Sequence, residues 1–166
     1  MKIAVISDTH NKTAVLELVI SHVKALGVSH LIHCGDLTLS QTLLPCRGLR
    51  VYLAYGNGDY DRVGINKMLT ELNPQNSFGT VQDFTLDGQS FFVAHGDESK
   101  CIHTALESGA YQWVLQGHTH RFRDEKLGQT RWINPGALGG LKIEERSFVI
   151  LDTSKKSVER IKVEGL

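Results

Sequence analysis

The sequence is poor in cysteine, lacks a long apolar run and carries no excess of either charge. Its three cysteines form no C-x-x-C pair, which argues against a disulfide framework and predicts reduced thiols in a cytoplasmic setting. No apolar run is long enough to cross a membrane, so no membrane partner is expected. Lys and Arg number 18, as do Asp and Glu, and this balance disfavours extended nucleic-acid binding.

The chain has the length and composition of one globular unit. It contains 166 residues, of which 41% are apolar, enough to form a substantial core. No linker, internal repeat or low-complexity stretch interrupts it. We therefore expect a single domain over residues 1–166.

The predicted elements mostly alternate between strand and helix. An apolar β-branched run predicts a strand at residues 3–6, and residues 12–26 carry apolar side chains at helical spacing. The remaining expected elements are strands at 30–34, 50–55, 113–116, 121–127, 130–133, 148–151 and 158–163, a hairpin of 81–86 with 89–94, a short helix at 39–47 and a helix at 99–108. This mixture predicts an α/β fold, a four-layer α/β/β/α sandwich with two packed mixed sheets.

Five short polar clusters each follow a predicted strand. Because ligands bind outside the carboxyl ends of strands in open α/β sheets, these clusters are expected to meet in one crevice. Each alone has a plain explanation as a turn or a helix start, but the complete ordered set predicts a metal site. Imidazole, carboxylate and amide donors suit Mn, Fe, Zn, Ni or Co. The candidate metal ligands are Asp8, His10, Asp36, Asn57, His95, His118 and His120.

The order D-x-H, G-D, G-N-x-D, H-G and G-H-x-H closely resembles the signature of the calcineurin-like metallophosphoesterase superfamily. The opening Ser7-Asp8-Thr9-His10 and the turn at residues 134–136 look most like its compact YfcE-like phosphodiesterase branch. The resemblance implies an enzyme with two divalent metal ions, manganese first among the alternatives, that hydrolyses small phosphodiesters through a metal-bridging hydroxide. It also implies three sets of ligands: Asp8, His10 and His120 for one metal, Asn57, His95 and His118 for the other, and Asp36 between them.

Under the same resemblance, Asp36, Asn57 and His118 act in catalysis through the metals, and Asn57 also contacts substrate. Two positions depart from the family pattern. Gly58 stands where many relatives carry a proton-donating histidine, so leaving groups that need little protonation should be favoured. Asp97 replaces a second histidine, and it either orients His95 or caps the helix expected from residue 99, with the cap slightly preferred.

Structural roles are preferred for the other polar residues near these clusters. Asn11 could contact phosphate or cap the first helix, with the cap preferred, and Asp59 is expected to tether its loop by hydrogen bonds. His33 is expected to be a satisfied core histidine. The mouth of the site is expected to include some of Tyr60, Asp61, Arg62, Arg121 and Phe122.

Alternatives to a phosphodiesterase remain at this point. A non-catalytic scaffold of the same fold is one, since a retromer subunit uses the fold in that way, although no ligand position is lost here. A phosphomonoesterase or a nuclease is another. The partner expected is a small phosphoester, and a homo-oligomer stays open beside a monomer.

Overall fold

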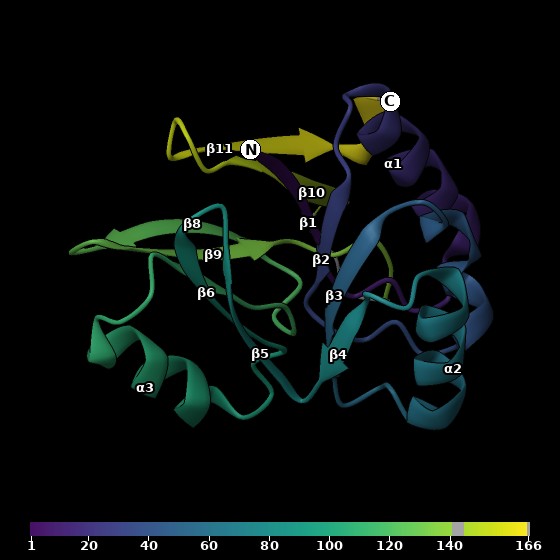
Figure 1. Cartoon of the computed structure of the whole chain (residues 1–166), viewed down its shortest axis with the longest axis horizontal. Coiled ribbons are helices and arrows are strands. Elements are labelled where there is room, and N and C mark those ends of the chain that lie inside the picture. The colour runs from purple at the N-terminus through teal and green to yellow at the C-terminus, as the bar shows by residue number, and fades with distance from the viewer. Residues whose placement is uncertain (141–144, 166) are drawn as a thin grey trace.

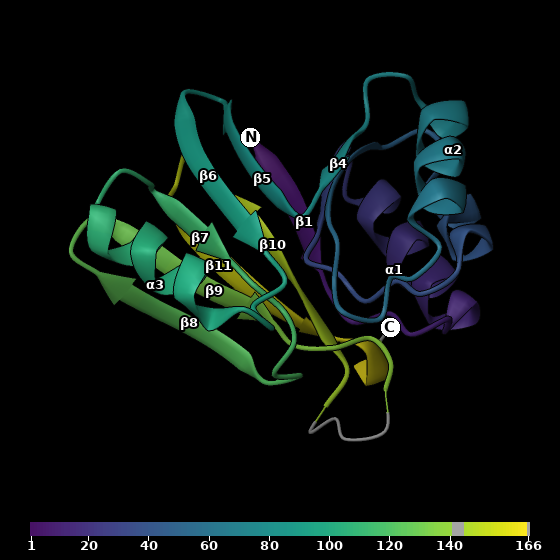
Figure 2. The same cartoon turned by 90° about the horizontal axis from the view of Figure 1, so that it is seen from below.

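The computed structural model describes residues 1–140 and 145–165 and arranges them in four layers (Figure 1). Two β-sheets pack face to face, and helices cover the outer face of each sheet (Figure 2). This arrangement confirms the predicted α/β/β/α sandwich with two mixed sheets. No described helix has both the length and the apolar character needed to cross a membrane.

The first sheet has six strands in the order β11-β10-β1-β2-β3-β4. Strands β1 to β4 run parallel to one another, and β10 pairs antiparallel with both β1 and β11. The parallel strands therefore end at one edge of the sheet. Their bounds are β1 (Lys2–Ile6), β2 (His30–His33), β3 (Arg50–Ala54), β4 (Ser77–Gly79), β10 (Ser147–Asp152) and β11 (Ser157–Lys162).

The second sheet has five strands in the order β5-β6-β7-β9-β8. Its three central strands are parallel, and each edge strand is antiparallel to its neighbour. Asp87 and Gly88 both adopt positive φ, as a two-residue hairpin requires, which confirms the predicted turn between β5 and β6. The bounds are β5 (Val81–Leu86), β6 (Gln89–Ala94), β7 (Trp113–Leu115), β8 (Phe122–Leu127) and β9 (Thr130–Pro135).

The helices divide between the two outer faces. Figure 2 shows α1 (Thr13–Ala25) and α2 (Arg62–Leu72) beside the first sheet and α3 (Ser99–Ser108) on the outer side of the second. The segment predicted as a short helix is the 3-10 helix η1 (Ser40–Cys46), which packs against α1 and α2. A second 3-10 helix, η2 (Val163–Gly165), follows β11.

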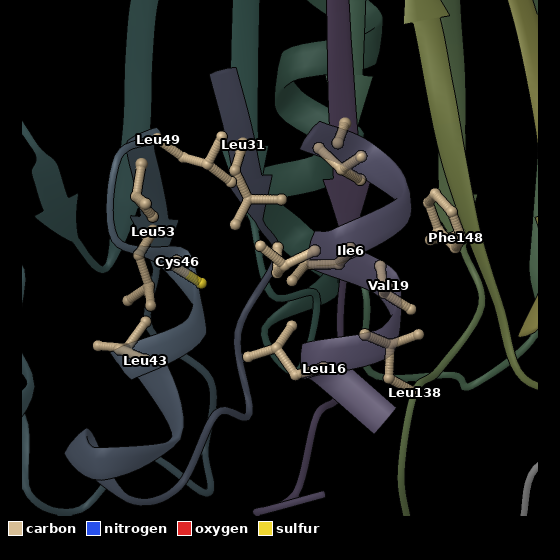
Figure 3. Packing of buried hydrophobic residues seen from close by; sticks show 14 of the residues in the cluster. Ile6, Leu16, Val19, Leu31, Leu43, Cys46, Leu49, Leu53, Leu138 and Phe148 are labelled. Atoms are coloured by element: carbon tan, nitrogen blue, oxygen red, sulfur yellow. The ribbon is translucent and has the colours of Figure 1, made fainter. Parts of the chain in front are cut away.

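Three apolar layers fill the spaces between the four layers, because alternate strand residues point to opposite faces of a sheet. In β1, Ala4 and Ile6 pack toward the helices, while Ile3 and Val5 pack toward the second sheet. Figure 3 shows Ile6 beside Leu16, Val19, Leu138 and Phe148. Burying a side chain of this size contributes about 1.5–3 kcal/mol, so these layers hold the strand ends rigidly in place.

No element was predicted between residues 56 and 80, where the structure contains α2 and β4. A helical pattern is nevertheless present, since Ile65 and Leu69 are buried and Met68 and Leu72 pack beside them. Asp61 caps the helix by accepting a hydrogen bond from Gly64 N at 2.9 Å. Gly64 within the first turn weakens the helical signal, and β4 is only three residues long.

Candidate metal centre

The predicted ligands lie on loops that leave parallel strands of both sheets. Asp8 and His10 follow β1, Asp36 follows β2, and Asn57 follows β3. His95 follows β6 in the second sheet, and the loop after β7 carries His118 and His120. Backbone hydrogen bonds join several of these loops, from Asp8 N to Gly35 O at 2.9 Å and from Gly117 N to His95 O at 2.9 Å.

Five of these ligands hold the left-handed backbone conformation, which non-glycine residues rarely adopt. The φ angles are 53° for Asp8, 44° for His10, 58° for Asp36, 66° for His118 and 58° for His120. Each such residue costs about 1–2 kcal/mol, and strain of this kind concentrates at functional sites. The loops are therefore shaped by a requirement other than local stability.

One group of donors consists of Asp8, His10 and His120. The Nε2 atom of His120 lies 3.1 Å from Asp8 Oδ1, and that of His10 lies 3.9 Å from the same oxygen. The two Nε2 atoms are 3.3 Å apart. Their donor atoms all lie within 4.8 Å of one another, as do those of a second group, Asp8, Asp36 and His95.

Asp36 lies between histidines from both sheets. Its Oδ2 is 3.7 Å from His10 Nε2, and its Oδ1 is 3.5 Å from His95 Nε2. His118 extends this side, with Nδ1 at 3.3 Å from His95 Nε2. Asp36 thus presents one carboxylate oxygen to an imidazole from each sheet.

Charge inside the site shifts two pKa values in opposite directions. Burial opposes ionisation of Asp36, but His95, the Gly58 N–H and His10 outweigh it and lower the Asp36 pKa to about 2. Burial likewise opposes protonation of His95, but Asp36 and Asp8 raise its pKa to about 9. The site thus favours positive charge between its carboxylates.

Hydrogen bonds from other residues fix the orientation of the predicted metal ligands, which together form the donor set. The carbonyl oxygen of Cys34 lies 2.8 Å from His95 Nδ1, which directs Nε2 toward Asp36. Asp59 accepts bonds from the backbone N–H groups of Asp36 at 3.0 Å, Thr38 at 2.7 Å and Gly56 at 2.8 Å. Asp59 thus joins the loop after β3 to the loop after β2 by hydrogen bonds.

Asn134 fixes the loop that follows β7. It is fully buried, and its Nδ2 donates to Gly117 O at 2.6 Å and to Thr119 Oγ1 at 3.1 Å. Its Oδ1 accepts from Gly136 N at 3.0 Å. The side chain therefore holds the loop that carries His118 and His120, a role that the sequence did not predict.

His33 joins two of the ligand loops. It is fully buried, as predicted, and its Nδ1 accepts from Gly35 N at 3.1 Å. This leaves Nε2 as the protonated nitrogen, which donates to Thr9 Oγ1 at 2.9 Å. Burial lowers the His33 pKa to about 4, although nearby carboxylates act in the opposite direction.

Close packing explains the glycine that precedes His118. A Cβ atom on Gly117 would lie 1.9 Å from Ser7 Oγ and 2.7 Å from Asp8 Oδ2. Any larger residue there would push the β7 loop away from Asp8. The backbone N–H of His118, which donates to Asp8 Oδ2 at 3.1 Å, depends on this approach.

Two expected helix caps are wrong. Asn11 does not cap α1, because its Oδ1 accepts from Leu39 N at 2.8 Å and so holds the start of η1. Asp97 is exposed and does not cap α3, whose N-cap position is Glu98 with no side-chain cap bond. The orienting contact to His95 Nδ1 comes from Cys34 instead.

Among the described residues, the side chain of Asn57 lacks the hydrogen bonds that orient other predicted ligands. Its side chain is exposed and makes no hydrogen bond within the described residues. The adjacent Gly58 N, however, donates to Asp36 Oδ1 at 2.6 Å. The backbone of this loop therefore reaches the donor set.

The residues present fit a divalent cation. Asp8 Oδ1 is buried and accepts no hydrogen bond from any described residue, although His120 Nε2 faces it. Unpaired buried carboxylate oxygens are costly unless they coordinate a metal or pair with a charge. The histidine and carboxylate donors are those that transition metals prefer.

Two mixed sheets between helices, with carboxylates and imidazoles at their parallel strand ends, define a metallophosphoesterase. The calcineurin-like phosphoesterase superfamily domain matches residues 1–156, and the chain belongs to this family. It is therefore a hydrolase of phosphoric esters, of a fold that implies divalent metal binding, and both statements confirm the enzyme class that the sequence predicted.

Two individual relatives are similar to the chain over nearly its whole length. Phosphodiesterase MJ0936 of Methanocaldococcus jannaschii is 31% identical over 166 residues, covering 99% of this chain and 100% of that protein. The structure of an archaeal phosphodiesterase has a TM-score of 0.93 at 30% identity, with 98% of this chain and 99% of that chain covered.

More distant structures share the fold alone. The phosphoesterase YfcE from E. coli has a TM-score of 0.68 at 18% identity, with 98% of this chain and 100% of that chain covered. Vps29 of Entamoeba histolytica complexed with zinc has a TM-score of 0.73 at 15% identity, with coverages of 98% and 99%.

Proposed function

We propose that the chain is a two-metal-dependent phosphodiesterase that hydrolyses small phosphodiesters at the centre around Asp36. The observation that carries this proposal is the pair of donor groups on either side of that carboxylate, with His10 at 3.7 Å and His95 at 3.5 Å. The relative named a phosphodiesterase supports the diester as the substrate class.

In this proposal, Asp8, His10 and His120 would hold one metal, Asn57, His95 and His118 would hold the other, and Asp36 would contribute to both sites. Bound divalent metals would supply a water of lowered pKa and positive charge beside the phosphoryl oxygens. Manganese is the first expectation, with Fe, Zn, Ni and Co as alternatives of similar ligand preference.

The protein itself contributes by positioning the proposed metal ligands. The Cys34 carbonyl and the Asp59 carboxylate fix His95 and the Asp36 loop, so the donors need little rearrangement on binding. The mouth of the site is lined by Tyr55, Arg62 and Asp97. Asn57 and Asn11 remain proposed substrate contacts, the second despite its bond to Leu39.

No proton donor stands at position 58. Since Gly58 has no side chain, the leaving oxygen must depart without a proton from that residue. Aryl and other stable leaving groups are therefore expected to react fastest. This makes bis(p-nitrophenyl) phosphate a suitable first substrate.

The first prediction concerns two ligand substitutions. With Mn²⁺ added, Asp36→Ala and His118→Ala should each reduce kcat/KM for bis(p-nitrophenyl) phosphate by about 10³-fold, because several kcal/mol of transition-state stabilisation are lost. The matched control Glu107→Gln, on the exposed part of α3, should keep wild-type activity. Equal activity in all four proteins would refute the assignment.

Metal analysis separates this proposal from a non-catalytic scaffold. A chain that retains no metal after purification and gains none from added Mn²⁺ would support the scaffold. Parallel assays with p-nitrophenyl phosphate and a short single-stranded oligonucleotide distinguish a monoesterase and a nuclease from the proposed diesterase.

A further inference from the structure

A groove extends from the candidate metal centre along α3. Beside the centre, a cavity of about 130 Å³ is lined by His95, Arg62 and Tyr55 among others. A larger cavity of about 540 Å³ lies between α3 and the strands β5 and β6. Both cavities are lined by Val81, Glu98 and Cys101, so the two lie side by side.

The outer part of the groove is mainly apolar. Its walls include Phe92 from β6, Ala105 from α3 and Tyr111, which precedes β7. These residues belong to the apolar cluster between α3 and the second sheet, so the walls are rigid parts of the core. Charged groups, Glu98 and Lys100, stand among the lining residues near the start of α3.

The inner part is lined by charged side chains of both signs, the guanidinium of Arg62 and the carboxylates of Asp97 and Glu98. The guanidinium carbon of Arg62 lies 4.8 Å from the centre of the Tyr55 ring, and Arg62 Nε donates to Asp59 O at 3.4 Å. Stacking and this bond hold the Arg62 side chain at the cavity that His95 also lines. Arg62 can therefore pair with a singly charged phosphate bound in that cavity.

We propose that the groove binds one ester group of the substrate and makes the enzyme selective for phosphodiesters with a large apolar aryl or alkyl group. The proposal rests on the proposed function. The shared lining of the two cavities supports this occupant, since a molecule that spans both places its phosphate near His95 and its apolar part beside Phe92. A volume of 540 Å³ falls within the range of small-molecule sites.

The test compares two unreactive anions on the Mn²⁺-loaded protein. Diphenylphosphinate and dimethylphosphinate share the charged centre of a phosphodiester and have no ester bond, so calorimetric titration measures binding alone. The diphenyl compound should bind at least tenfold more tightly than the dimethyl compound. Equal affinities would overturn the proposal.

Substitutions locate the selectivity in the groove. Thr104→Trp fills it from an exposed position of α3, and should reduce the preference for diphenylphosphinate to near unity while leaving dimethylphosphinate binding unchanged. Thr85→Trp is the matched control, because Thr85 is also exposed but lines neither cavity. If Thr104→Trp does not fold, Val81→Ser removes apolar surface instead and should lower the preference several-fold.

Arg62 provides an internal check. Arg62→Gln should weaken both phosphinates by the same factor, because the guanidinium meets the anion that they share. A preference unchanged in Thr104→Trp and Val81→Ser would overturn the groove assignment and leave the groove to another occupant, such as a peptide segment.

Hydrolysis of two diesters distinguishes the groove proposal from the proposed function. Methyl and phenyl p-nitrophenyl phosphate release the same leaving group, and the phenyl diester should show the higher kcat/KM. If neither diester is hydrolysed but the phosphinate preference holds, the proposed function fails and the groove survives. If both are hydrolysed equally and bound equally, the groove fails and the proposed function survives.

Discussion

Individual residues of the donor set are held by partners that lie far away in the sequence. Cys34 orients His95 through a carbonyl oxygen, and Asn134 holds the loop before His118 through its amide. Such contacts control how accurately ligands are presented to a metal.

Asn134→Ala should weaken both metal binding and the stability of the fold. The change removes both anchors of the Gly117–Thr119 loop and leaves the Gly117 carbonyl buried without its donor, at a cost of about 1–3 kcal/mol in unfolding free energy. Manganese affinity, measured by calorimetry, should fall about 10- to 100-fold. Asn134→Asp retains the acceptor toward Gly136 N but not the donor, and should show the same loss of affinity. Unchanged affinity in both variants would remove Asn134 from the positioning set.

His33 should give the metal-free protein a distinctive dependence on pH. Its pKa is about 4 in the folded chain, below the ordinary 6.5, so the unfolded chain binds the extra proton between these values. Stability should therefore fall as pH decreases from 6.5 to 4, by an amount on the order of 2–3 kcal/mol. His95 acts mainly between 6.5 and its folded value of about 9, where its contribution to stability is lost as pH rises.

The measurement is urea unfolding of chelator-treated protein across this pH range. His33→Gln can still accept from Gly35 N and donate to Thr9, but it does not titrate. Its stability should vary less between pH 4 and 6.5 than that of the wild type. Asp36 contributes below its ordinary value of 3.8 and so lies outside the window. An identical slope in wild type and variant would contradict the assignment to His33.

At the scale of elements, α2 links the fold to the mouth of the site. The helix begins at Arg62, the residue whose guanidinium stacks on Tyr55, and Ile65 and Leu69 bury it against the first sheet. Its position depends on Asp61, which caps its first turn.

Asp61→Ala should destabilise the protein by about 1 kcal/mol, because the cap bond to Gly64 N is lost. Asp97→Ala is the matched control. Asp97 also precedes a helix and is exposed, but it makes no cap bond, so its removal should change stability by less than about 0.5 kcal/mol. Urea denaturation midpoints at constant slope provide the comparison. A similar loss in both variants would indicate a general effect of removing negative charge.

At the scale of the molecule, metal binding and stability are coupled. The donors come from both sheets, so a bound ion would join the two sheets that the central apolar layer already packs together. A ligand that binds only the folded chain stabilises it by about 2.7 kcal/mol at a concentration of 100 Kd.

Added Mn²⁺ should therefore raise the thermal unfolding midpoint, and a chelator should reverse the change. His120→Ala should lose most of the increase, while Glu107→Gln should keep it. Differential scanning calorimetry measures this directly. An unchanged midpoint in the wild type would argue for a chain that does not use metal. Light scattering on the same samples would test the homo-oligomer, which stays a prediction, as do the cytoplasmic setting and the single domain.

Local patterns in the sequence determined most of the architecture. Period-two and helical spacings identified nearly all strands and helices, because burial on one face imposes these periods. They also placed the ligands at strand ends, where Asp8, Asp36, His95 and His118 are found. Among the described elements, α2, β4 and the 3-10 helix η2 were missed. The helical pattern of α2 is weakened by Gly64, and β4 and η2 are each three residues long.

The tertiary structure alone decided how the site is held and what surrounds it. The bonds from Cys34 to His95 and from Asn134 to Gly117 join residues 61 and 17 positions apart, so no local pattern reveals them. The same is true of the groove, whose walls come from β5, β6 and α3. Residue types and their order determine which atoms can bind a metal. Packing of the layers determines which of those atoms meet, because it sets the relative positions of the strand ends.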